Sequence, residues 1–307
     1  MSALLALPDA GSAEVVVDGR RLTLTSLDKV LWPASGFTKG HMLAYYASVA
    51  DALLPHIAGR PVTLGRFPEG VERPGFAGTE CRGRPDWLRT RPLPLRSGEV
   101  RNFCLLDDAA SLLWAVNLGS VELHPYLGAG AEGNDAVVAV FDLDPAPGAS
   151  LLDAARMALH IRSLLAAVGL AAFAKTSGAS GLHVVVPLGE PHPYEEVSAF
   201  AAGIAGALEA EHPGEVSQAA RRAGRAGRVL VDWRQNHPRR STIAPYSLRS
   251  TPRPLVSAPV DWPEIEDAVA AGAPEALVFP PATVLDRAER LGDLHAPVLT
   301  RRQRLPA

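Results

Sequence analysis

The first feature that could do chemistry is a pair of aspartates, Asp142 and Asp144, which follows the apolar run 136–141. Such a run is typical of a buried strand, and strand side chains two residues apart point to the same face. Both carboxylates therefore share one face, while Phe141 and Leu143 point into a core. Mg²⁺ is commonly bound through one or two carboxylates plus substrate phosphates. The pair predicts a divalent-metal site, although alone it also fits a glycosyltransferase, a calcium loop or an ordinary strand end.

A third acid, Asp232, ends the apolar strand expected at 228–233. A charge at the end of a buried strand is costly unless it is paired or bound to a metal. One interpretation is a salt bridge to a nearby arginine, which would be Arg225, Arg228 or Arg234. The other is that Asp232 joins the aspartate pair. Three acids at two strand ends, beside a basic surface, favour two-metal phosphoryl transfer.

The basic surface is visible only in the distribution of charge. The chain carries 30 Lys and Arg against 33 Asp and Glu, a net charge of −3. Residues 221–253 nevertheless hold nine arginines and one acid, so this window is +8 and the rest of the chain is −11. A concentrated basic face on an acidic body is typical of a site for nucleic-acid backbone or a triphosphate. A solvated basic face is the alternative.

A glycine-bearing turn provides a second possible phosphate contact. Residues 177–183 read SGASGLH and separate two apolar segments that we expect to be strands. Ser177 and Gly178 begin the turn, whose backbone N–H groups could face an anion. His183 lies two residues into the next strand and could donate to a phosphate oxygen. The alternative is a histidine whose hydrogen bonds are satisfied within the sheet.

The chain has only three lysines, Lys29, Lys39 and Lys175. Lys39 is expected in the first turn of a helix at 39–54 with Thr38 as N-cap, where free N–H groups and the helix dipole favour an anion. Lys29 precedes it by ten residues in the same turn-rich loop. The alternative is that Lys29 pairs with Asp28 or another acid and that Lys39 is solvated.

The elements that would position these residues alternate between strands and helices. Periodicity and turn residues predict a hairpin at 14–25, strands at 61–67, 136–141, 228–233 and 242–247, and helices at 39–54, 151–169, 195–211, 263–271 and 284–291. A glycine-rich stretch at 128–136 separates an N-terminal module from a core. The expected parts are 1–127, 128–252 and 253–307, the last a Pro-rich segment whose short helices pack on the core. This order indicates the α+β class.

Composition excludes several classes of protein. The chain has 307 residues, of which 47% are hydrophobic and 21% charged, as in globular proteins. No apolar run reaches the roughly 18 residues of a membrane span, and the N-terminus lacks the basic region of a secretory signal. Cys81 and Cys104 lie in no CxxC or Cys/His cluster, which argues against structural zinc. We expect a cytoplasmic protein with two free thiols.

The motifs together resemble a known family. The segments FDLDP, SGASGLHV and VLVDWRQNHPRRSTIAPYSLR are similar, in this order, to the signature motifs of the polymerase domain of bacterial ligase D, in the archaeo-eukaryotic primase superfamily. Similar segments along nearly the whole chain are TSLDKVLWPASGFTKG, HIAGRPVTLGRFP, PDWLRT, LGSVELHP and DLHAPVL. The resemblance implies an α+β fold: a primase-polymerase core of mixed and antiparallel sheets flanked by helices, plus a smaller N-terminal α/β module. The chain looks like a stand-alone relative of this domain, without ligase or nuclease modules, of the type found alongside ligase D in actinobacteria.

The resemblance also implies roles for individual residues. Asp142, Asp144 and Asp232 would hold two ions, Mn²⁺ or Mg²⁺. The residues that would bind the incoming nucleotide are His124, Ser177, Gly178, His183, Arg222, Arg225, Gln235 and Arg249. Ser26, Lys29 and Lys39 would bind the 5′-phosphate of a gapped or broken DNA end, and Phe76 would contact the template.

The family extends primers with nucleoside triphosphates, often prefers ribonucleotides, and includes members that prime. Implied partners are gapped or broken DNA, a separate DNA ligase and a Ku-type end-binding protein, in the cytoplasm at the nucleoid and away from membranes. Three positions depart from the family. A position near Gly65 is often basic in relatives, and here only Arg66 remains. Ser180 replaces a lysine common in relatives, and Ala77 replaces the aromatic partner of Phe76. The alternatives are therefore a DNA-end-binding or scaffolding module with little synthesis, and an unrelated Asp-x-Asp enzyme.

Overall fold

The computed structural model describes residues 7–8, 11–95, 97–128, 135–219 and 225–306, in two compact units. Unit 1 takes the described residues of Met1–Tyr126, Ile243–Val256 and Pro280–Gly292. Unit 2 takes those of Leu127–Thr242, Ser257–Phe279 and Asp293–Ala307. The sequence predicted three consecutive parts, whereas both units are assembled from separate stretches. Residues 243–252, expected in the core, lie in unit 1, and 253–307 is shared between the units.

A six-stranded sheet forms the centre of unit 2, in the order β13-β14-β10-β12-β11-β17. Its strands are β10 Asp135–Pro145, β11 Phe173–Thr176, β12 Leu182–Pro193, β13 Val216–Ser217, β14 Val229–Asp232 and β17 Pro259–Val260. Neighbouring strands are antiparallel, except that β13 and β14 are parallel.

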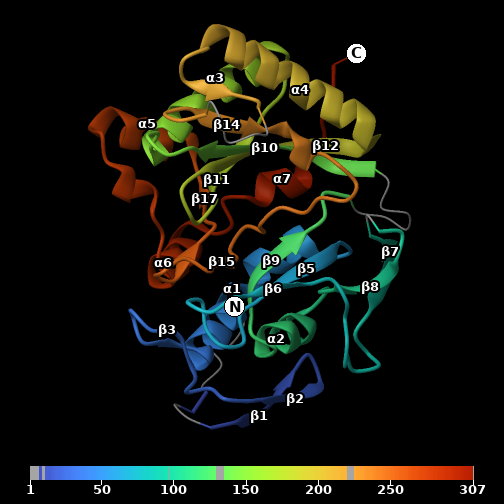
Figure 1. Ribbon diagram of the computed structural model, residues 1–307. Coiled ribbons are helices and arrows are strands. Elements are labelled where there is room, and N and C mark those ends of the chain that lie inside the picture. The colour runs from blue at the N-terminus through green and yellow to red at the C-terminus, as the bar shows by residue number, and fades with distance from the viewer. Residues whose placement is uncertain (1–6, 9–10, 96, 129–134, 220–224, 307) are drawn as a thin grey trace. The chain divides into compact units, whose positions relative to one another are not determined.

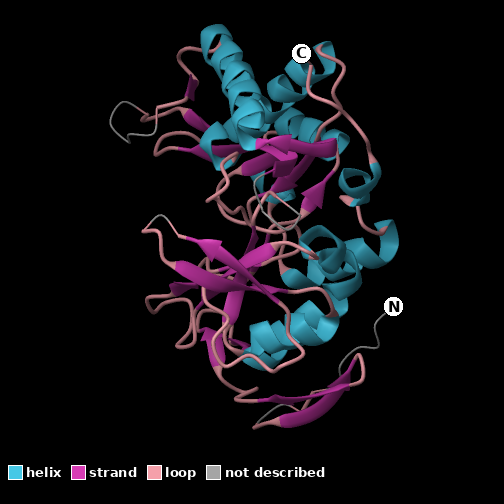
Figure 2. Ribbon diagram, turned by 90° about the vertical axis from the view of Figure 1, so that its right-hand side faces the viewer, coloured by secondary structure: helices cyan, strands magenta, loops and turns pink. Residues whose placement is uncertain are grey.

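Two long helices, α3 (Leu151–Ala167) and α4 (Tyr194–Glu211), cover one face of this sheet (Figure 1, Figure 2). Helix α3 begins where the sequence predicted, because Ser150 and Asp153 form a capping box. The remaining helical segments of unit 2 are η1 Trp233–Gln235, α5 Trp262–Ala271, η2 Pro274–Leu277 and α7 Ala296–Thr300.

Unit 1 is built around strand β5 (Pro61–Arg66), which pairs with β6, β8 and β9. The other strands of this sheet are β6 Phe76–Gly78, β7 Thr90–Pro94, β8 Val100–Leu105 and β9 Ser120–Pro125. Its helices are α1 Lys39–Ile57, α2 Ala109–Asn117 and α6 Pro281–Leu291. Three two-stranded sheets complete the unit: β1 Ala13–Val17 with β2 Arg20–Leu24, β3 Val30–Trp32 with β4 Phe37–Thr38, and β15 Leu248–Arg249 with β16 Leu255–Val256.

The mixture of antiparallel sheets and helices confirms the predicted α+β class. The predicted helices at 39–54, 195–211 and 263–271 are present as α1, α4 and α5, within three residues at either end. None of the helices in the described part of the chain combines the length and hydropathy that a bilayer crossing requires.

The strand predicted at 242–247 is wrong. Pro245 has no backbone N–H to give to a ladder, and Tyr246 adopts a left-handed φ of 65°, so the segment turns instead of extending. The carbonyl of Tyr246 accepts a hydrogen bond from the Tyr45 hydroxyl of α1, at 2.8 Å. The short strand β15 follows this turn.

The expectation of two free thiols is also wrong in the structure, which joins Cys81 and Cys104 as a disulfide. The loop after β6 runs beside β8, since Cys81 N donates to the carbonyl of Asn102 at 2.8 Å. This backbone contact brings the two cysteines together, with their Cα atoms 5.2 Å apart. Such a long-range contact cannot be read from the spacing of two cysteines.

One side chain ties the end of β14 to the centre of the sheet. Asn236 is fully buried, and its amide accepts from Val140 N at 2.8 Å and donates to Val140 O at 2.7 Å. It also donates to the carbonyl of Trp233, at 2.8 Å. The amide thus takes the place of a neighbouring strand beside β10, just before Asp142.

Replacing Asn236 with alanine should destabilise unit 2. The substitution leaves a buried N–H and a buried C=O of Val140 without partners, which should lower the free energy of unfolding by roughly 2–4 kcal/mol. Urea denaturation of wild type and Asn236→Ala measures this. A loss below about 0.5 kcal/mol, the level of an ordinary surface substitution, would contradict the anchoring role.

Candidate active site

The register of unit 2 aligns four polar side chains in one row across four strands. Asp232 of β14 lies opposite Asp142 of β10, Asp142 lies opposite His183 of β12, and His183 lies opposite Lys175 of β11. Directly opposed residues of antiparallel strands share a face, with Cβ atoms about 4.5–5.5 Å apart. The sequence predicted three of these residues; Lys175 was noted only as one of three lysines. The row is thus acidic at one end and basic at the other.

The acidic end brings two carboxylates together. The Gln235 side-chain amide donates to Asp232 Oδ2 at 3.2 Å and to Asp142 Oδ2 at 3.4 Å. His183 Nε2 lies 3.3 Å from Asp142 Oδ1. Burial, and secondly the negative charge of Asp142, raise the pKa of Asp232. The predicted alternative, a salt bridge from Asp232 to Arg234, is long at 3.9 Å.

The donor set fits a divalent cation. Oxygen atoms, including those of carboxylates, are the preferred ligands of Mg²⁺, and a cation would offset the burial and the repulsion by Asp142 that together raise the pKa of Asp232. Asp144 is exposed two residues beyond Asp142, on the same face of β10. Among the described residues, no group of three or more His, Cys, Asp or Glu side chains is arranged to hold a metal ion alone. A cation bound here would therefore take further oxygens from water or substrate phosphate.

The glycine-bearing turn packs directly against β10. The Ser177 hydroxyl accepts from Ala179 N at 3.2 Å and Gly181 N at 3.1 Å, so this side chain shapes the turn. Gly178 has a left-handed φ of 71°. A Cβ at Gly181 would lie 2.0 Å from the carbonyl oxygen of Leu143, the residue between the two aspartates of β10. Only glycine allows this approach.

The basic window is only partly described. Arg222 lies outside the described residues. Arg225 is 8% exposed, and its Nε has no hydrogen-bond partner within the described ranges. A buried guanidinium favours an anion as partner, which is consistent with the predicted triphosphate contact.

His124 and Arg249, the predicted nucleotide contacts in unit 1, meet at an acid that the sequence analysis did not identify. Glu122 Oε2 lies 2.8 Å from His124 Nε2 and 3.4 Å from Arg249 Nη1. Glu122 and His124 are two apart on β9, so strand alternation places them on one face. The arginine comes from β15, more than a hundred residues later, which is why the cluster could not be read from the sequence.

Ser26, Lys29 and Lys39 are brought together in unit 1. Lys29 N donates to Ser26 O at 3.1 Å, and Lys39 N donates to Lys29 O at 2.8 Å. Lys39 is 7% exposed, with its ammonium 3.3 Å from Thr25 Oγ1. Burial and the positive charge of Lys29 lower the pKa of Lys39 to about 8. Two crowded ammonium groups suit an anion carrying more than one charge.

Two details differ from the expected geometry of this pocket. The N–H groups of Lys39, Gly40 and His41 already donate to Lys29 O, Leu27 O and Thr38 Oγ1, so the first turn of α1 does not present them to a ligand. Lys29 pairs with an acid, as the alternative interpretation allowed, but the acid is Glu69, at 3.0 Å. An anion at Lys29 would compete with this exposed pair.

Phe76, the predicted template contact, is 51% exposed on strand β6 of unit 1. The guanidinium of Arg66 lies over its ring, 5.1 Å from the centroid. The pair leaves an aromatic ring at the surface next to a positive charge, which suits stacking with a nucleic-acid base.

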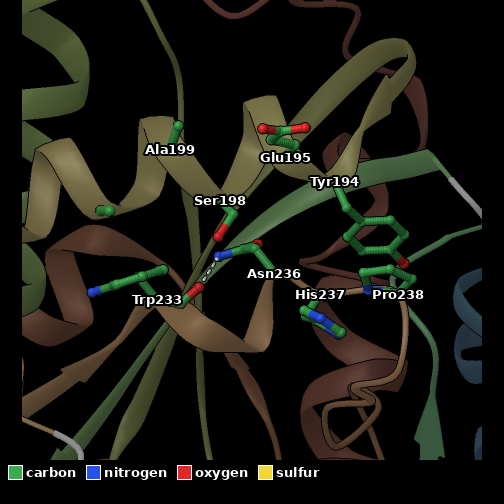
Figure 3. A pocket seen from close by; sticks show the side chains of 9 residues that line it. Tyr194, Glu195, Ser198, Ala199, Trp233, Asn236, His237 and Pro238 are labelled. Carbon is green, nitrogen blue, oxygen red and sulfur yellow. Dashed lines mark hydrogen bonds between the residues drawn. The ribbon is translucent and has the colours of Figure 1, made fainter. Parts of the chain in front are cut away.

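A separate cavity of about 500 Å³ lies between α4 and the segment after Asp232 (Figure 3). Its lining is Tyr194, Glu195, Ser198, Ala199, Ala202, Trp233, Asn236, His237 and Pro238. The ring of Tyr194 lies beside Pro238 at one end. None of the predicted site residues lines the cavity.

Comparison with known proteins gives a consistent result. The family profile described as "LigD, primase-polymerase domain" matches residues 38–295. The multifunctional non-homologous end joining DNA repair protein LigD of Mycobacterium tuberculosis H37Rv is 40% identical over 257 residues, which is 81% of this chain and 34% of the relative. The bifunctional non-homologous end joining protein LigD of Bacillus subtilis is 28% identical over 273 residues, 89% of this chain and 43% of the relative. The chain thus spans about a third to two fifths of these relatives.

A solved structure matches most of the chain. It is described as the polymerase domain from Mycobacterium tuberculosis ligase D in complex with DNA. The TM-score is 0.84 with 37% sequence identity, over 92% of this chain and 99% of the other.

The close approach at Gly181 leads to a prediction. Gly181→Ala should push β10 at Leu143, lowering the free energy of unfolding by about 1–3 kcal/mol and weakening Mn²⁺ binding by the flanking aspartates. Thermal unfolding with and without Mn²⁺ measures both. Gly203→Ala on α4 is the matched control: nothing lies within 4 Å of its added Cβ, so it should stabilise by up to about 1 kcal/mol. Equal behaviour of the two variants would refute the steric argument.

Proposed function

Because the chain belongs to the LigD primase-polymerase domain family, we propose that it is a metal-dependent nucleotidyltransferase that extends primers on gapped or broken DNA during end-joining repair. The observation that carries the proposal is the row of Asp232, Asp142 and His183 across adjacent strands. An acidic pair beside a cationic or hydrogen-bonding group is what a metal-bound triphosphate requires.

In the proposed reaction the primer 3′-hydroxyl loses its proton to solvent, and its oxygen forms a bond to the α-phosphorus of a nucleoside triphosphate. The bond from that phosphorus to the β-phosphate oxygen breaks, and pyrophosphate leaves. Mn²⁺ or Mg²⁺ held by Asp142, Asp144 and Asp232 would stabilise the charge on the attacking and leaving oxygens. The resemblance to the family supports two ions.

The other residues would bind and orient the nucleotide. His183 lies next to the aspartate pair and can donate to a phosphate oxygen, while Arg225 supplies a guanidinium whose Nε has no hydrogen bond to any residue that the structure describes. The resemblance to the family also gives His124 and Arg249 of unit 1 a role as nucleotide contacts. Gln235 donates to both carboxylates, and the resemblance to the family implies that this side chain also contacts the nucleotide.

The DNA end would be selected by its 5′-phosphate at Lys29 and Lys39, and the template would contact Phe76. Ribonucleotides would be used at least as well as deoxyribonucleotides, a proposal that rests on the family alone. The proposed partners are a DNA ligase and a Ku-type end-binding protein at the cytoplasmic nucleoid. The exposed Ser180, in place of a lysine common in relatives, keeps open the alternative of an end-binding module with little synthesis.

Primer extension on gapped DNA tests the proposal. With Mn²⁺ or Mg²⁺ and each kind of nucleotide, the wild type should add nucleotides opposite a template. Binding of 5′-phosphorylated DNA without any incorporation would favour the end-binding alternative, and the ratio of ribonucleotide to deoxyribonucleotide use would decide the sugar preference.

Asp142→Asn should lower incorporation on the order of 10³-fold or more, because a lost metal ligand acts on the chemical step. Without metal the variant should be no less stable than wild type, since the amide removes the charge that repels Asp232. Mn²⁺ should raise the Tm of wild type but not of the variant. Asp135→Asn, at the exposed start of the same strand, is the control and should retain activity. Near-normal extension by Asp142→Asn would overturn the assignment.

The preference for a 5′-phosphate should depend on pH. Lys39, with a pKa near 8, loses its charge as the pH rises through that value, and a terminal phosphate becomes a dianion above about pH 6. The affinity ratio of 5′-phosphate to 5′-hydroxyl ends should therefore be largest near pH 7 and fall toward pH 9. Fluorescence anisotropy at low salt measures this ratio.

Two variants sharpen the pH test. Lys39→Ala should abolish both the preference and its pH dependence, a loss of roughly 10–100-fold for a charge-assisted contact. Glu69→Gln removes the acid that pairs with Lys29 and should strengthen the preference at every pH. An affinity ratio of one in wild type would remove the pocket from the proposal.

A further inference from the structure

Glu122 is a buried acid at the centre of a closed set of hydrogen bonds. It is 8% exposed on β9, where an unpaired carboxylate would be costly. Its Oε1 accepts from Ser250 N at 2.9 Å and from Ser250 Oγ at 2.7 Å. Its Oε2 faces His124 Nε2 and Arg249 Nη1, at 2.8 and 3.4 Å. Each oxygen therefore has two partners, which fills its acceptor capacity.

The carboxylate is ionised across the working pH range. Burial alone would raise the pKa of Glu122, but the hydrogen bond from His124, the charge of Arg249 and the backbone N–H of Ser250 outweigh it and lower the pKa to about 2. An ionised carboxylate only accepts, so His124 Nε2 must carry the hydrogen of this contact. Glu122 thereby fixes the orientation of the ring.

The same contact leaves part of the arginine available. Arg249 meets Glu122 through a single terminal nitrogen, without the bidentate geometry of a closed Arg–carboxylate pair. Its Nε is buried and has no hydrogen-bond partner in the described part of the chain. The guanidinium is thus held in place while still lacking an acceptor at Nε.

A glycine on the neighbouring strand makes room for this arrangement. Gly65 of β5 lies directly opposite Glu122 in the sheet register. A Cβ at position 65 would come within 2.8 Å of the Glu122 Cβ, a distance that real Cβ atoms do not reach. The backbone of Gly65 does not have a positive φ, so its conformation does not require glycine. The glycine is required because a side chain at this position would displace Glu122.

We propose that Glu122 is a positioning residue of the nucleotide site, which orients His124 and Arg249 as a pair for the triphosphate. Gly65 leaves the space that the Glu122 side chain needs. The proposal rests on the proposed function, in which His124 and Arg249 bind the incoming nucleotide. A purely structural acid would stabilise unit 1 through Ser250 alone and would have no effect on nucleotide affinity once the protein is folded.

Steady-state extension by Glu122→Gln tests the role. The amide has the same shape but loses the charge and can accept at only one atom, so both partners lose their fixed orientation. The KM for the nucleoside triphosphate should rise roughly 10–100-fold, the effect of weakening charge-assisted hydrogen bonds, with a much smaller change in kcat. Inhibition by inorganic tripolyphosphate should weaken by the same factor, because this probe lacks base and sugar. Affinity for 5′-phosphorylated DNA should not change.

Two further variants keep the test decisive if Glu122→Gln folds poorly. Gly65→Ala retains the carboxylate but displaces it, and should raise the KM and the tripolyphosphate inhibition constant in the same direction. Asp108→Asn is the structural control: Asp108 caps α2 and pairs with Arg20 in the same unit, without contact to the His124–Arg249 pair. It should lower Tm and leave the KM unchanged.

The outcomes separate the two proposals. Absence of incorporation by the wild type would refute the proposed function and, with it, this inference. An active wild type whose Glu122→Gln and Gly65→Ala variants change only Tm, or only kcat, would refute the positioning role and leave the function intact. A KM rise matched by weaker tripolyphosphate inhibition in both variants would establish it.

Discussion

The constraint on which unit 2 depends is the direct opposition of two carboxylates in one sheet. Asp142 and Asp232 face each other across β10 and β14, where burial and secondly the charge of Asp142 disfavour the charged form of Asp232 and raise its pKa. If strands β10 and β14 could move freely, the two carboxylates would move apart. The sheet holds them, because Phe141 and Leu143 are fully buried on the other face and Asn236 fastens the end of β14 to Val140. A divalent cation would favour the charged form of both carboxylates and so offset burial and repulsion together.

The local part of this arrangement could be predicted from the sequence. Period-two alternation placed Asp142 and Asp144 on one face, and the capping box fixed the start of α3. The register could not be predicted, because it pairs residues about ninety positions apart, and neither strand carries a mark of its partner. The pairing of Lys175 with His183 is different, because the two lie only eight positions apart on adjacent strands and directly opposite each other. Lys175 was noted as a rare lysine, and this local hairpin was not used to place it in the row.

In unit 1, contacts between residues far apart in the sequence were even harder to predict. Its acid, Glu122, looks like any polar residue in an alternating strand, and only the return of the chain at 249–250 brings Arg249 and Ser250 to it. The expected strand at 242–247 failed for a local reason that the sequence did contain, since Pro245 cannot donate to a ladder. The disulfide between Cys81 and Cys104 depended on a loop following β8, which no local pattern indicates.

Each unit holds side chains of like charge close together, negative in unit 2 and positive in unit 1. In unit 2 the closely spaced pair is negative, Asp142 with Asp232, which suits a cation. In unit 1 the close pair Lys29 and Lys39 is positive, and Arg249 Nε has no acceptor among the described residues, so both suit phosphate. Like charges held close in a fold raise its free energy unless a ligand neutralises them. A metal-bound nucleotide and a phosphorylated DNA end would do so at separate places, which is why we interpret these clusters as binding sites and not as incidental surface charge.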